Sequence, residues 1–276
     1  MKPQFVTLHS GALNRRINCV VYLPPDYETS DKRYPSVYLL HGLGGSELDW
    51  HMKGNASETI ASLVKNGELA ESIVVMPSDG GFDRGTFYLD WYDGSGNFEQ
   101  YFIHDLVPAI DRKFRTVACR EYRGIAGLSM GGYGAFLLSL RNPELFGAAA
   151  SISGPLALMP DHDELSMTPT WHPANSARLV GPLGGPYSQA HNVAALAKKA
   201  MGNTNFPALY IDCGTEDYLY AANVWFKAEL DKAGYPHQYE TYPGEHNWHY
   251  FSVHLKGALR FLNAFLTRAG NPHAKE

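Results

Sequence analysis

Residues 127–131 read Gly-Leu-Ser-Met-Gly and fit the G-x-S-x-G pattern, in which a serine hydroxyl is presented as a nucleophile. An apolar run over residues 123–128 precedes the serine, and an apolar helix is predicted over residues 130–140. This order suits a sharp strand-to-helix turn that lifts the Ser129 hydroxyl out of a sheet. Glycine is needed two residues to either side, because a Cβ there would collide with the strained turn. A chance serine in a tight turn is the plainer interpretation, but the strand–turn–helix context favours a nucleophile.

A serine hydroxyl is a weak nucleophile unless a base removes its proton. The partners of such a serine follow later in the chain, first an acid and then a histidine. Past the next-to-last predicted strand, Asp217 is the preferred acid and Glu216 is the alternative. Past the last strand, His246 is the preferred base and His249 is the alternative. In this interpretation His246 takes the proton of Ser129, and Asp217 fixes the tautomer of the imidazole.

The tetrahedral intermediate of acyl transfer needs hydrogen-bond donors for its oxyanion. One donor is expected from the backbone N–H of Met130, at the start of the helix. The second is expected from the loop over residues 41–45, whose glycines leave a backbone N–H unobstructed. Leu43 is the preferred donor in this loop, and Gly44 is the alternative. A phosphate-binding loop is excluded, since the lysine and the glycine spacing of such loops are missing.

Short apolar runs and helical patterns alternate along the chain, which predicts βαβ units and a mostly parallel sheet. Continuous apolar runs suit strands that are covered on both faces. Residues 5–9 and 17–23 instead predict an antiparallel pair joined around Gly11. The other predicted strands are residues 36–40, 73–76, 123–128, 148–152, 208–213 and 237–242. The predicted helices are residues 55–66, 98–114, 130–140, 221–233 and an apolar stripe over 251–266.

Residues 154–186 break this alternation, because they are rich in Pro, Gly, Asp and His and have no clear period. A compact domain rarely contains so long an irregular stretch unless it is functional. We therefore expect a single domain over residues 1–276, with residues 154–186 as an insertion or lid over the active site, or as an oligomer contact. The acidic run at residues 161–164 is expected to be a solvated loop, since metal ligands converge from several elements.

The composition excludes several classes of protein. The chain of 276 residues has a net charge of −5, so it does not have the basic character that nucleic-acid binding needs. No apolar stretch of about 18 residues predicts a membrane span, and early polar residues argue against a signal peptide. The three widely spaced cysteines favour free thiols in a cytoplasmic protein over disulfides or a zinc site. We expect no metal and no cofactor.

The chain resembles the α/β-hydrolase esterases of the esterase D type, which include tributyrin, feruloyl and acetylxylan esterases, S-formylglutathione hydrolases and mycolyltransferases. The resemblance covers most of the chain and is most specific in Ala-Gly-Leu-Ser-Met-Gly-Gly-Tyr-Gly-Ala, residues 126–135. It also rests on residues 22–27, 40–45, 214–217 and 244–248. It implies a twisted, mostly parallel sheet of about eight strands with helices on both faces. It implies the same site residues that the motifs predict, namely Ser129, Asp217, His246, Leu43 and Met130.

The resemblance also implies that the loop around residues 90–92 faces the substrate. The candidate substrate-binding residues are Trp50, Asp90, Trp91 and Trp248. The tryptophans could line an acyl or aryl pocket, although we expect half of them to pack in the core instead. Seven aromatic rings between residues 87 and 102 suggest an apolar wall beside the site.

The leading hypothesis is a cofactor-free serine carboxylesterase that cleaves acetyl, butyryl or feruloyl esters through an acyl-enzyme. Its expected partner is a small-molecule or carbohydrate-linked ester, and a homo-oligomer is compatible with the sequence. An S-formylglutathione hydrolase, which cleaves a thioester, and an acyltransferase of the mycolyltransferase type would use the same triad. A hydrolase fold that only binds is the alternative outside enzymes, but the complete set of triad residues argues against it.

Overall fold

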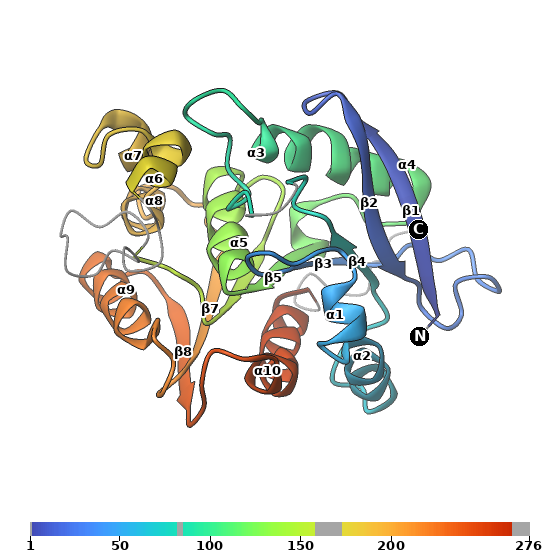
Figure 1. Ribbon diagram of the computed structural model, residues 1–276. Helices are drawn as coiled ribbons and strands as arrows, with labels where there is room; N and C mark the ends of the chain where they lie inside the picture. Colours follow the sequence, from blue (N-terminus) through green and yellow to red (C-terminus); the bar gives the residue numbers. More distant parts are fainter. Residues whose placement is uncertain (1, 82–84, 158–172, 267–276) are drawn as a thin grey trace.

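The computed structural model describes residues 2–81, 85–157 and 173–266 (Figure 1). Its centre is one eight-stranded sheet with the strand order β1-β2-β4-β3-β5-β6-β7-β8. The pairs β1–β2 and β2–β4 are antiparallel, and the other five neighbouring pairs are parallel. This sheet confirms the predicted α/β-hydrolase fold class. The strands are β1 (Pro3–Ser10), β2 (Arg15–Tyr22), β3 (Ser36–Leu40), β4 (Ile73–Pro77), β5 (Arg123–Leu128), β6 (Ala148–Ile152), β7 (Ala208–Gly214) and β8 (His237–Tyr242).

Burial along the strands explains why their sequences differ. Every residue of β3, β4, β5 and β6 is buried, as expected for strands covered on both faces. The edge strand β8 has no buried residue and a polar sequence, which suits a strand with one open side. The strongly apolar runs therefore place β3 and β5, which lead to residues 41–45 and to Ser129, in the middle of the sheet, whereas β8, which leads to His246, forms its edge.

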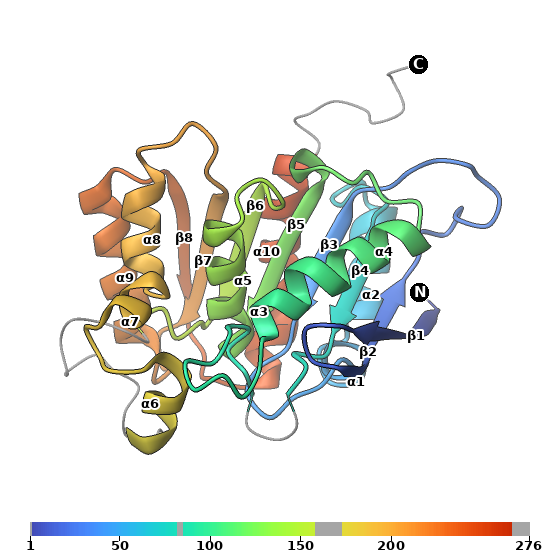
Figure 2. The same cartoon turned by 90° about the horizontal axis from the view of Figure 1, so that it is seen from above.

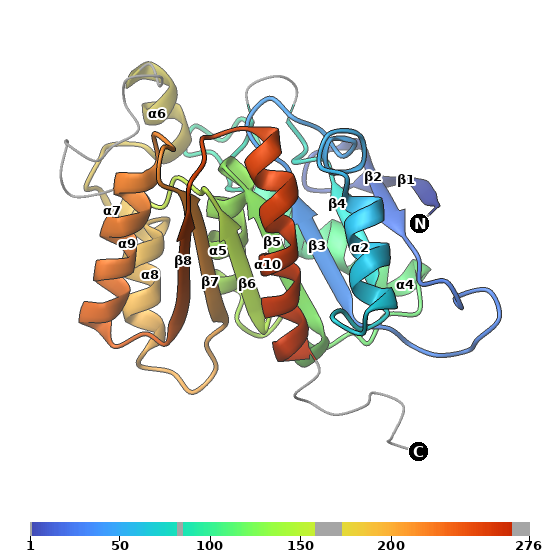
Figure 3. The ribbon, with the colours of Figure 1, turned by 90° about the horizontal axis from the view of Figure 1, so that it is seen from below.

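Helices cover the two faces of the sheet in separate layers (Figure 2 and Figure 3). Helices α4, α5, α8 and α9 lie on one face, and α2 and α10 lie on the other. The buried apolar side chains form two clusters, one on each face. The helices are α1 (Asp49–Met52), α2 (Ala56–Lys65), α3 (Phe98–Gln100), α4 (Val107–Lys113), α5 (Met130–Arg141), α6 (Pro173–Val180), α7 (Pro186–Ala190), α8 (Val193–Ala200), α9 (Tyr220–Ala233) and α10 (Trp248–Leu266).

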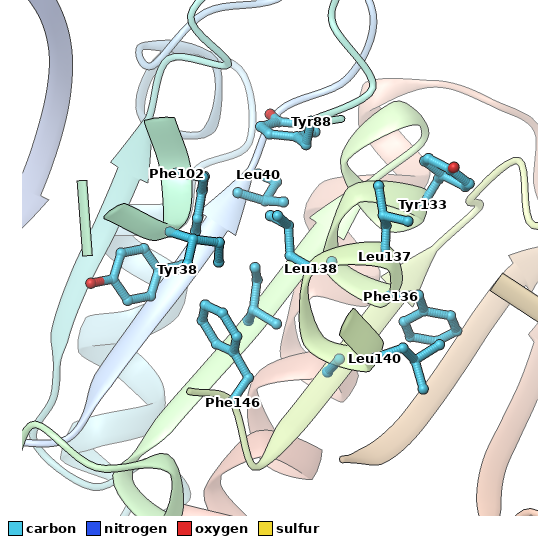
Figure 4. Packing of buried hydrophobic residues seen from close by; sticks show 14 of the residues in the cluster. Tyr38, Leu40, Tyr88, Phe102, Tyr133, Phe136, Leu137, Leu138, Leu140 and Phe146 are labelled. Carbon is cyan, nitrogen blue, oxygen red and sulfur yellow. The ribbon is translucent and has the colours of Figure 1, made fainter. Parts of the chain in front are cut away.

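Aromatic rings fill the layer between β3 and the helices on the α5 face (Figure 4). The ring centroid of Tyr38 lies 5.6 Å from that of Phe102 and 6.1 Å from that of Phe146. Leu138 of α5 belongs to the same cluster. Through Leu138, α5 therefore packs into the same layer as these edge-to-face and tilted rings. The first residue of α5 follows Ser129 directly, so this packing also fixes the turn that carries the serine.

The helical run after residue 97 differs in detail from the predicted helix over residues 98–114. It is continuous from α3 to α4, but residues Tyr101–Leu106 form a π-helix in its middle. Helix α6 lies inside the stretch 154–186, where no regular element was predicted. Residues 158–172, which include the acidic run at 161–164, lie outside the described residues, so the predicted lid stays a prediction.

Two further findings concern membranes and cysteines. None of the helices in the described ranges is both long and apolar enough to cross a bilayer. All three cysteines are free thiols, and Cys19 and Cys213 are buried. Burial raises the pKa of the Cys19 thiol to about 12, so this cysteine stays protonated and unreactive near neutral pH.

Candidate active site

Ser129 sits in the sharp turn between β5 and α5, at the carboxyl edge of the parallel strands (Figure 2). Its φ of 52° and ψ of −124° lie in a region that L-residues rarely adopt. A Cβ on Gly127 would lie 2.2 Å from the carbonyl oxygen of Gly131, and a Cβ on Gly131 would lie 2.6 Å from that of Leu40. Both glycines are therefore required by contact with backbone atoms, as the motif predicts.

Three side chains from separate loops meet at this turn. His246 Nε2 lies 2.9 Å from Ser129 Oγ, and His246 Nδ1 lies 2.8 Å from Asp217 Oδ2. The second carboxylate oxygen of Asp217 accepts a hydrogen bond of 2.8 Å from the backbone N–H of Leu219. Asp217 is buried, whereas the His246 side chain keeps 15% of its surface exposed. The arrangement can remove the hydroxyl proton of Ser129 and hold the resulting imidazolium against a carboxylate.

The alternative acid and base lie elsewhere. Glu216 accepts hydrogen bonds from the hydroxyl of Thr215 and from the backbone N–H of Gly244. These two bonds, the first more than the second, hold the pKa of Glu216 below its ordinary value. His249 is exposed, and its backbone carbonyl accepts a hydrogen bond from the hydroxyl of Ser252. Neither group reaches Ser129.

The two predicted oxyanion donors, Leu43 and Met130, come from segments that meet at Ser129. Gly42 packs against the serine, since a Cβ there would lie 3.3 Å from Ser129 Cβ. The side chains of Leu43 and Met130 lie close together over Gly85, because a Cβ there would lie 2.4 Å from Met130 Sδ and 2.7 Å from Leu43 Cδ1. Among the described residues, neither the Leu43 nor the Met130 N–H donates to a backbone or side-chain acceptor. Both are thus able to donate to a bound oxyanion.

His41 supports this loop, a role that the sequence analysis did not assign. The ring is buried, with Nδ1 2.8 Å from the carbonyl oxygen of Gly42 and Nε2 3.1 Å from the backbone nitrogen of Asp79. The hydroxyl of Tyr88 donates to the His41 carbonyl oxygen at 3.1 Å. The loop is therefore fixed from two sides by Asp79 and Tyr88, which belong to the segment that follows β4. The glycine-rich run was the only sequence signal, because Asp79 and Tyr88 are 38 and 47 residues away from His41.

Trp50 and Trp248 pack against each other on the α10 face. Trp50 is 1% exposed and donates its indole N–H to the Leu40 carbonyl oxygen at 2.9 Å. The two indole rings meet edge-on at 5.7 Å, and Trp248 also packs on Phe251. Trp50 is therefore a core residue behind the site, which corrects its assignment as a substrate contact. Trp248 is half-buried, and its contact with a substrate stays a prediction.

Asp90 and Trp91 brace the loop that contains them. Asp90 Oδ1 accepts a hydrogen bond of 3.1 Å from the backbone N–H of Gln100. The Trp91 indole N–H donates to the Thr86 carbonyl oxygen at 3.2 Å, and the Arg178 guanidinium lies over its ring at 5.3 Å. Both side chains are half-buried in these contacts. The structure thus gives them a local structural role, and their contact with a substrate stays a prediction.

The loop over residues 90–97 is joined to helix α6. The backbone N–H groups of Tyr92 and Asp93 donate to the carbonyl oxygens of Leu179 and Arg178 at 3.0 and 3.1 Å. Arg178 Nε also lies 2.6 Å from Asp93 Oδ2. The described part of the stretch 154–186 therefore packs beside the loop that the resemblance places at the substrate.

Two aromatic rings flank the imidazole of His246. The ring of Tyr218 lies 4.6 Å from that of His246, and Phe251 meets the other side edge-on at 5.0 Å. Burial, and then the charge of Asp217, raise the pKa of Tyr218. Tyr218 is nevertheless 67% exposed and Leu43 is 49% exposed, so two apolar side chains face solvent at the site. Within the described ranges, no group of three or more His, Cys, Asp or Glu side chains could hold a metal ion.

Comparison with known proteins adds the family. The profile of the Esterase family, described as "Putative esterase", matches residues 10–262. An esterase of Mycobacterium tuberculosis is 30% identical over 253 residues, which are 82% of this chain and 51% of that protein. An endo-1,4-beta-xylanase/feruloyl esterase of Xylanibacter ruminicola is 36% identical over 160 residues, which are 55% of this chain and 21% of that protein. The chain thus spans about half the length, or less, of these curated relatives.

Solved structures agree with the profile. A ferulic acid esterase superimposes with a TM-score of 0.80 at 29% identity, covering 96% of this chain and 98% of that one. An S-formylglutathione hydrolase from Staphylococcus aureus has a TM-score of 0.75 at 24% identity, covering 95% of this chain and 98% of that one. The second likeness is one of fold alone.

Proposed function

Because the chain belongs to the Esterase family, we propose that it is a serine carboxylesterase that hydrolyses short-chain acyl or aryl esters. The observation that carries the proposal is the continuous line of hydrogen bonds from Asp217 through His246 to Ser129, at 2.8 and 2.9 Å. Such a line activates a hydroxyl that is otherwise a weak nucleophile. The strained turn at Ser129 supports it, since a strained residue at the edge of a rigid sheet is typical of active sites.

In the first half of the proposed reaction, Ser129 Oγ attacks the ester carbonyl carbon while His246 Nε2 takes the hydroxyl proton. The carbonyl oxygen becomes an oxyanion that accepts hydrogen bonds from the N–H groups of Leu43 and Met130. When the C–O bond to the alcohol breaks, His246 returns the proton to the leaving alkoxide. Asp217 keeps the imidazole in the correct tautomer and stabilises its charged form.

In the second half, water replaces the alcohol. His246 takes a proton from the water as its oxygen attacks the acyl carbon of the acyl-enzyme. Collapse of the second tetrahedral intermediate releases the acid, and His246 returns the proton to Ser129 Oγ. The site ends in its starting state, and the proposed reaction consumes only the ester and water.

The side chains at the site favour a neutral acyl or aryl group as the substrate. The exposed apolar surfaces of Tyr218 and Leu43 offer contact to an uncharged ring or a short chain. The relatives named as feruloyl esterases act, by their names, on an aromatic acyl group. Acetyl, butyryl and feruloyl esters are accordingly the classes to test first, with a carbohydrate as one source of the alcohol.

The test compares p-nitrophenyl acetate, butyrate and octanoate with methyl ferulate and S-formylglutathione. Ser129→Ala should lose activity by several powers of ten, because the nucleophile is removed. Ser62→Ala, on the exposed face of α2, is the matched control and should keep the wild-type rate. A fluorophosphonate should label wild type and fail on Ser129→Ala.

The outcomes separate the alternatives. An initial burst of p-nitrophenol followed by slower turnover supports an acyl-enzyme. A preference for S-formylglutathione over every oxygen ester would replace the carboxylester by a thioester. If wild type neither turns over these esters nor reacts with the fluorophosphonate, the chain is a binding module and the proposal is wrong.

A further inference from the structure

A second buried carboxylate lies on β7, away from the triad and on the opposite side of the sheet from α5. Asp212 is fully buried, and three side chains contact its carboxylate. The phenol of Tyr250 donates to Oδ1, and His254 Nδ1 lies 2.8 Å from Oδ2. The hydroxyl of Tyr210 lies 3.2 Å from Oδ2. A buried carboxylate of this kind is costly to disturb, because its charge has no water to replace a lost donor.

Tyr250 and His254 belong to the first two turns of α10, the helix that follows the histidine loop. Their rings stack at a centroid distance of 3.9 Å with an interplanar angle of 13°. Spaced four residues apart, the two side chains lie on one face of the helix. Burial, and then the Asp212 carboxylate, raise the pKa of the Tyr250 phenol far above its ordinary value, so the phenol is a permanent donor. Asp212 therefore anchors the start of α10 to the middle of β7.

The ring of Tyr250 also touches the two loops that carry the triad. A Cβ on Gly244, in the histidine loop, would lie 2.4 Å from Tyr250 Cδ2. A Cβ on Gly214, at the start of the acid loop, would lie 3.2 Å from Tyr250 Cε2 and 2.2 Å from the Gly244 carbonyl oxygen. Because glycine has no Cβ, the Tyr250 ring can lie directly against the backbone of both loops. The phenol ring is thus wedged where the acid loop and the histidine loop cross.

The two loops are joined to each other at the same place. The backbone N–H of Glu216 donates to the Gly244 carbonyl oxygen at 3.1 Å, and that of Thr215 donates to the Tyr242 carbonyl oxygen at 2.9 Å. On the histidine side, Asn247 Oδ1 accepts from the backbone N–H of Tyr250 at 3.0 Å. A shift of Tyr250 would therefore move the loop of His246 relative to the loop of Asp217.

We propose that Tyr250, held by Asp212, is a positioning residue that sets the distance between Asp217 and His246. The inference rests on the proposed function, because it concerns the triad of that reaction. Tyr250 touches neither the serine nor a substrate; it acts by fixing where the imidazole meets its carboxylate. Since turnover falls steeply when reacting groups are misplaced by about 1 Å, a small movement of the loop is enough to be measured.

The test is Tyr250→Phe, which keeps the ring and removes the bond to Asp212. We expect kcat on p-nitrophenyl butyrate to fall about tenfold while KM stays within about twofold. The substitution leaves substrate binding unchanged and weakens stabilisation of the transition state, because the imidazole is less well placed. The acid limb of the pH–rate profile should move to lower pH, since a looser Asp217 contact stabilises the imidazolium less.

Tyr210→Phe is the matched control. It removes a hydroxyl that lies 3.2 Å from the same carboxylate and 3.0 Å from Glu240 Oε2, while the Tyr210 ring packs on Phe261 rather than on the triad loops. A merely structural role predicts that both variants lose thermal stability and keep kcat. Equal kcat values for the two variants, with an unmoved acid limb, would overturn the proposal.

Two further measurements keep the test decisive. If Tyr250→Phe does not fold, His254→Gln, which removes the stacked ring but leaves the phenol on Asp212, should lower kcat about threefold with KM unchanged; wild-type kcat would then count against the proposal. The rate of labelling by a fluorophosphonate separates this inference from the proposed function. No labelling of wild type refutes the esterase proposal, whereas equal labelling of wild type and Tyr250→Phe refutes only the role of Tyr250.

Discussion

Replacing Asp217 with asparagine should stop turnover by giving His246 the wrong tautomer. Both oxygens of Asp217 accept hydrogen bonds, one from the imidazole at 2.8 Å and one from the backbone N–H of Leu219 at 2.8 Å. An asparagine has only one oxygen for these two places, and its NH₂ group must fill the other. The backbone N–H cannot change its role, whereas an imidazole can carry its proton on either nitrogen.

The magnitude follows from that choice. Facing the NH₂ group toward the Leu219 N–H would leave a buried donor unpaired, which costs about 1–3 kcal/mol. The amide therefore turns its NH₂ toward His246 Nδ1, which puts the imidazole proton on Nε2, where it blocks proton transfer from Ser129. A preference of this size leaves the productive tautomer about 5- to 150-fold less populated. Loss of the charge opposite the imidazolium adds to this, and the same change in serine proteases costs about 10⁴-fold in kcat.

The assay is steady-state hydrolysis of p-nitrophenyl butyrate by Asp217→Asn, with KM expected within about threefold of wild type. Glu216→Gln is the matched control, because Glu216 lies next in sequence but bonds to Thr215 and Gly244. It should keep kcat within about twofold. If Asp217→Asn keeps more than a tenth of the wild-type kcat, or if Glu216→Gln loses as much, the assignment of the acid is wrong.

Three further predictions concern stability. Gly131→Ala should lower the free energy of unfolding in urea by about 1–3 kcal/mol, because the new Cβ would lie 2.6 Å from the Leu40 carbonyl oxygen. Asp111→Asn should lower it by about 3 kcal/mol, since the Arg123 guanidinium, 2.6 Å away and 2% exposed, would lose its counter-charge. In alkali, burial and then the charge of Glu58 raise the pKa of Tyr22 from 10.0 to about 12. Because the folded chain keeps this phenol neutral to higher pH than the unfolded chain does, the neutral Tyr22 contributes to the free energy of unfolding. That contribution is complete below pH 10 and is lost as the pH rises toward about 12, which urea titrations from pH 8 to pH 12 would detect.

The strands, and the grouping of Ser129, Asp217 and His246, could be predicted from patterns in the sequence. Apolar runs bounded by glycine and proline mark buried strands, and the order of serine, acid and histidine fixes which loops carry the partners. The choice of Asp217 over Glu216 was weak on sequence alone, and the structure supports it because the longer side chain folds back onto Gly244. The π-helix at Tyr101–Leu106 has no such local signal; its Asp105 is bonded instead to the distant Ser10 hydroxyl and Ala12 N–H at the end of β1.

Side chains that act through tertiary contacts could not be predicted. Most of the rings expected as a wall around the site are core residues instead: Phe87, Tyr88, Phe98, Tyr101 and Phe102 are all buried. Composition says how many rings there are, but only the fold says which side of the sheet they face. Trp50 was misplaced for the same reason, because its partner Trp248 comes from a helix almost 200 residues further along the chain.

The protein joins β7 to the region of α10 through two Asp–His pairs with the same Nδ1–Oδ2 distance of 2.8 Å. The inner pair, Asp212 with His254, lies within the strand and the helix. The outer pair, Asp217 with His246, lies three residues past the strand and two residues before the helix. Among the described residues, only the outer pair has a side chain within hydrogen-bond distance of a serine hydroxyl, so the proposed function assigns catalysis to the outer pair and not to the inner one.

The inner pair nevertheless limits the outer one. Asp212 is fully buried, so moving it from its donors would leave an uncompensated charge without water. Asp212 and its donors therefore fix the position of the short segments that connect the two pairs, residues 213–216 and 247–253. This argues that Asp212→Asn should impair turnover as well as stability, whereas breaking the exposed pair of Arg260 with Glu68, also on α10, should change stability by less than about 1 kcal/mol and leave kcat unchanged. A loss of kcat in the Arg260 variant equal to that in Asp212→Asn would mean that α10 as a whole, and not its buried anchor, places His246.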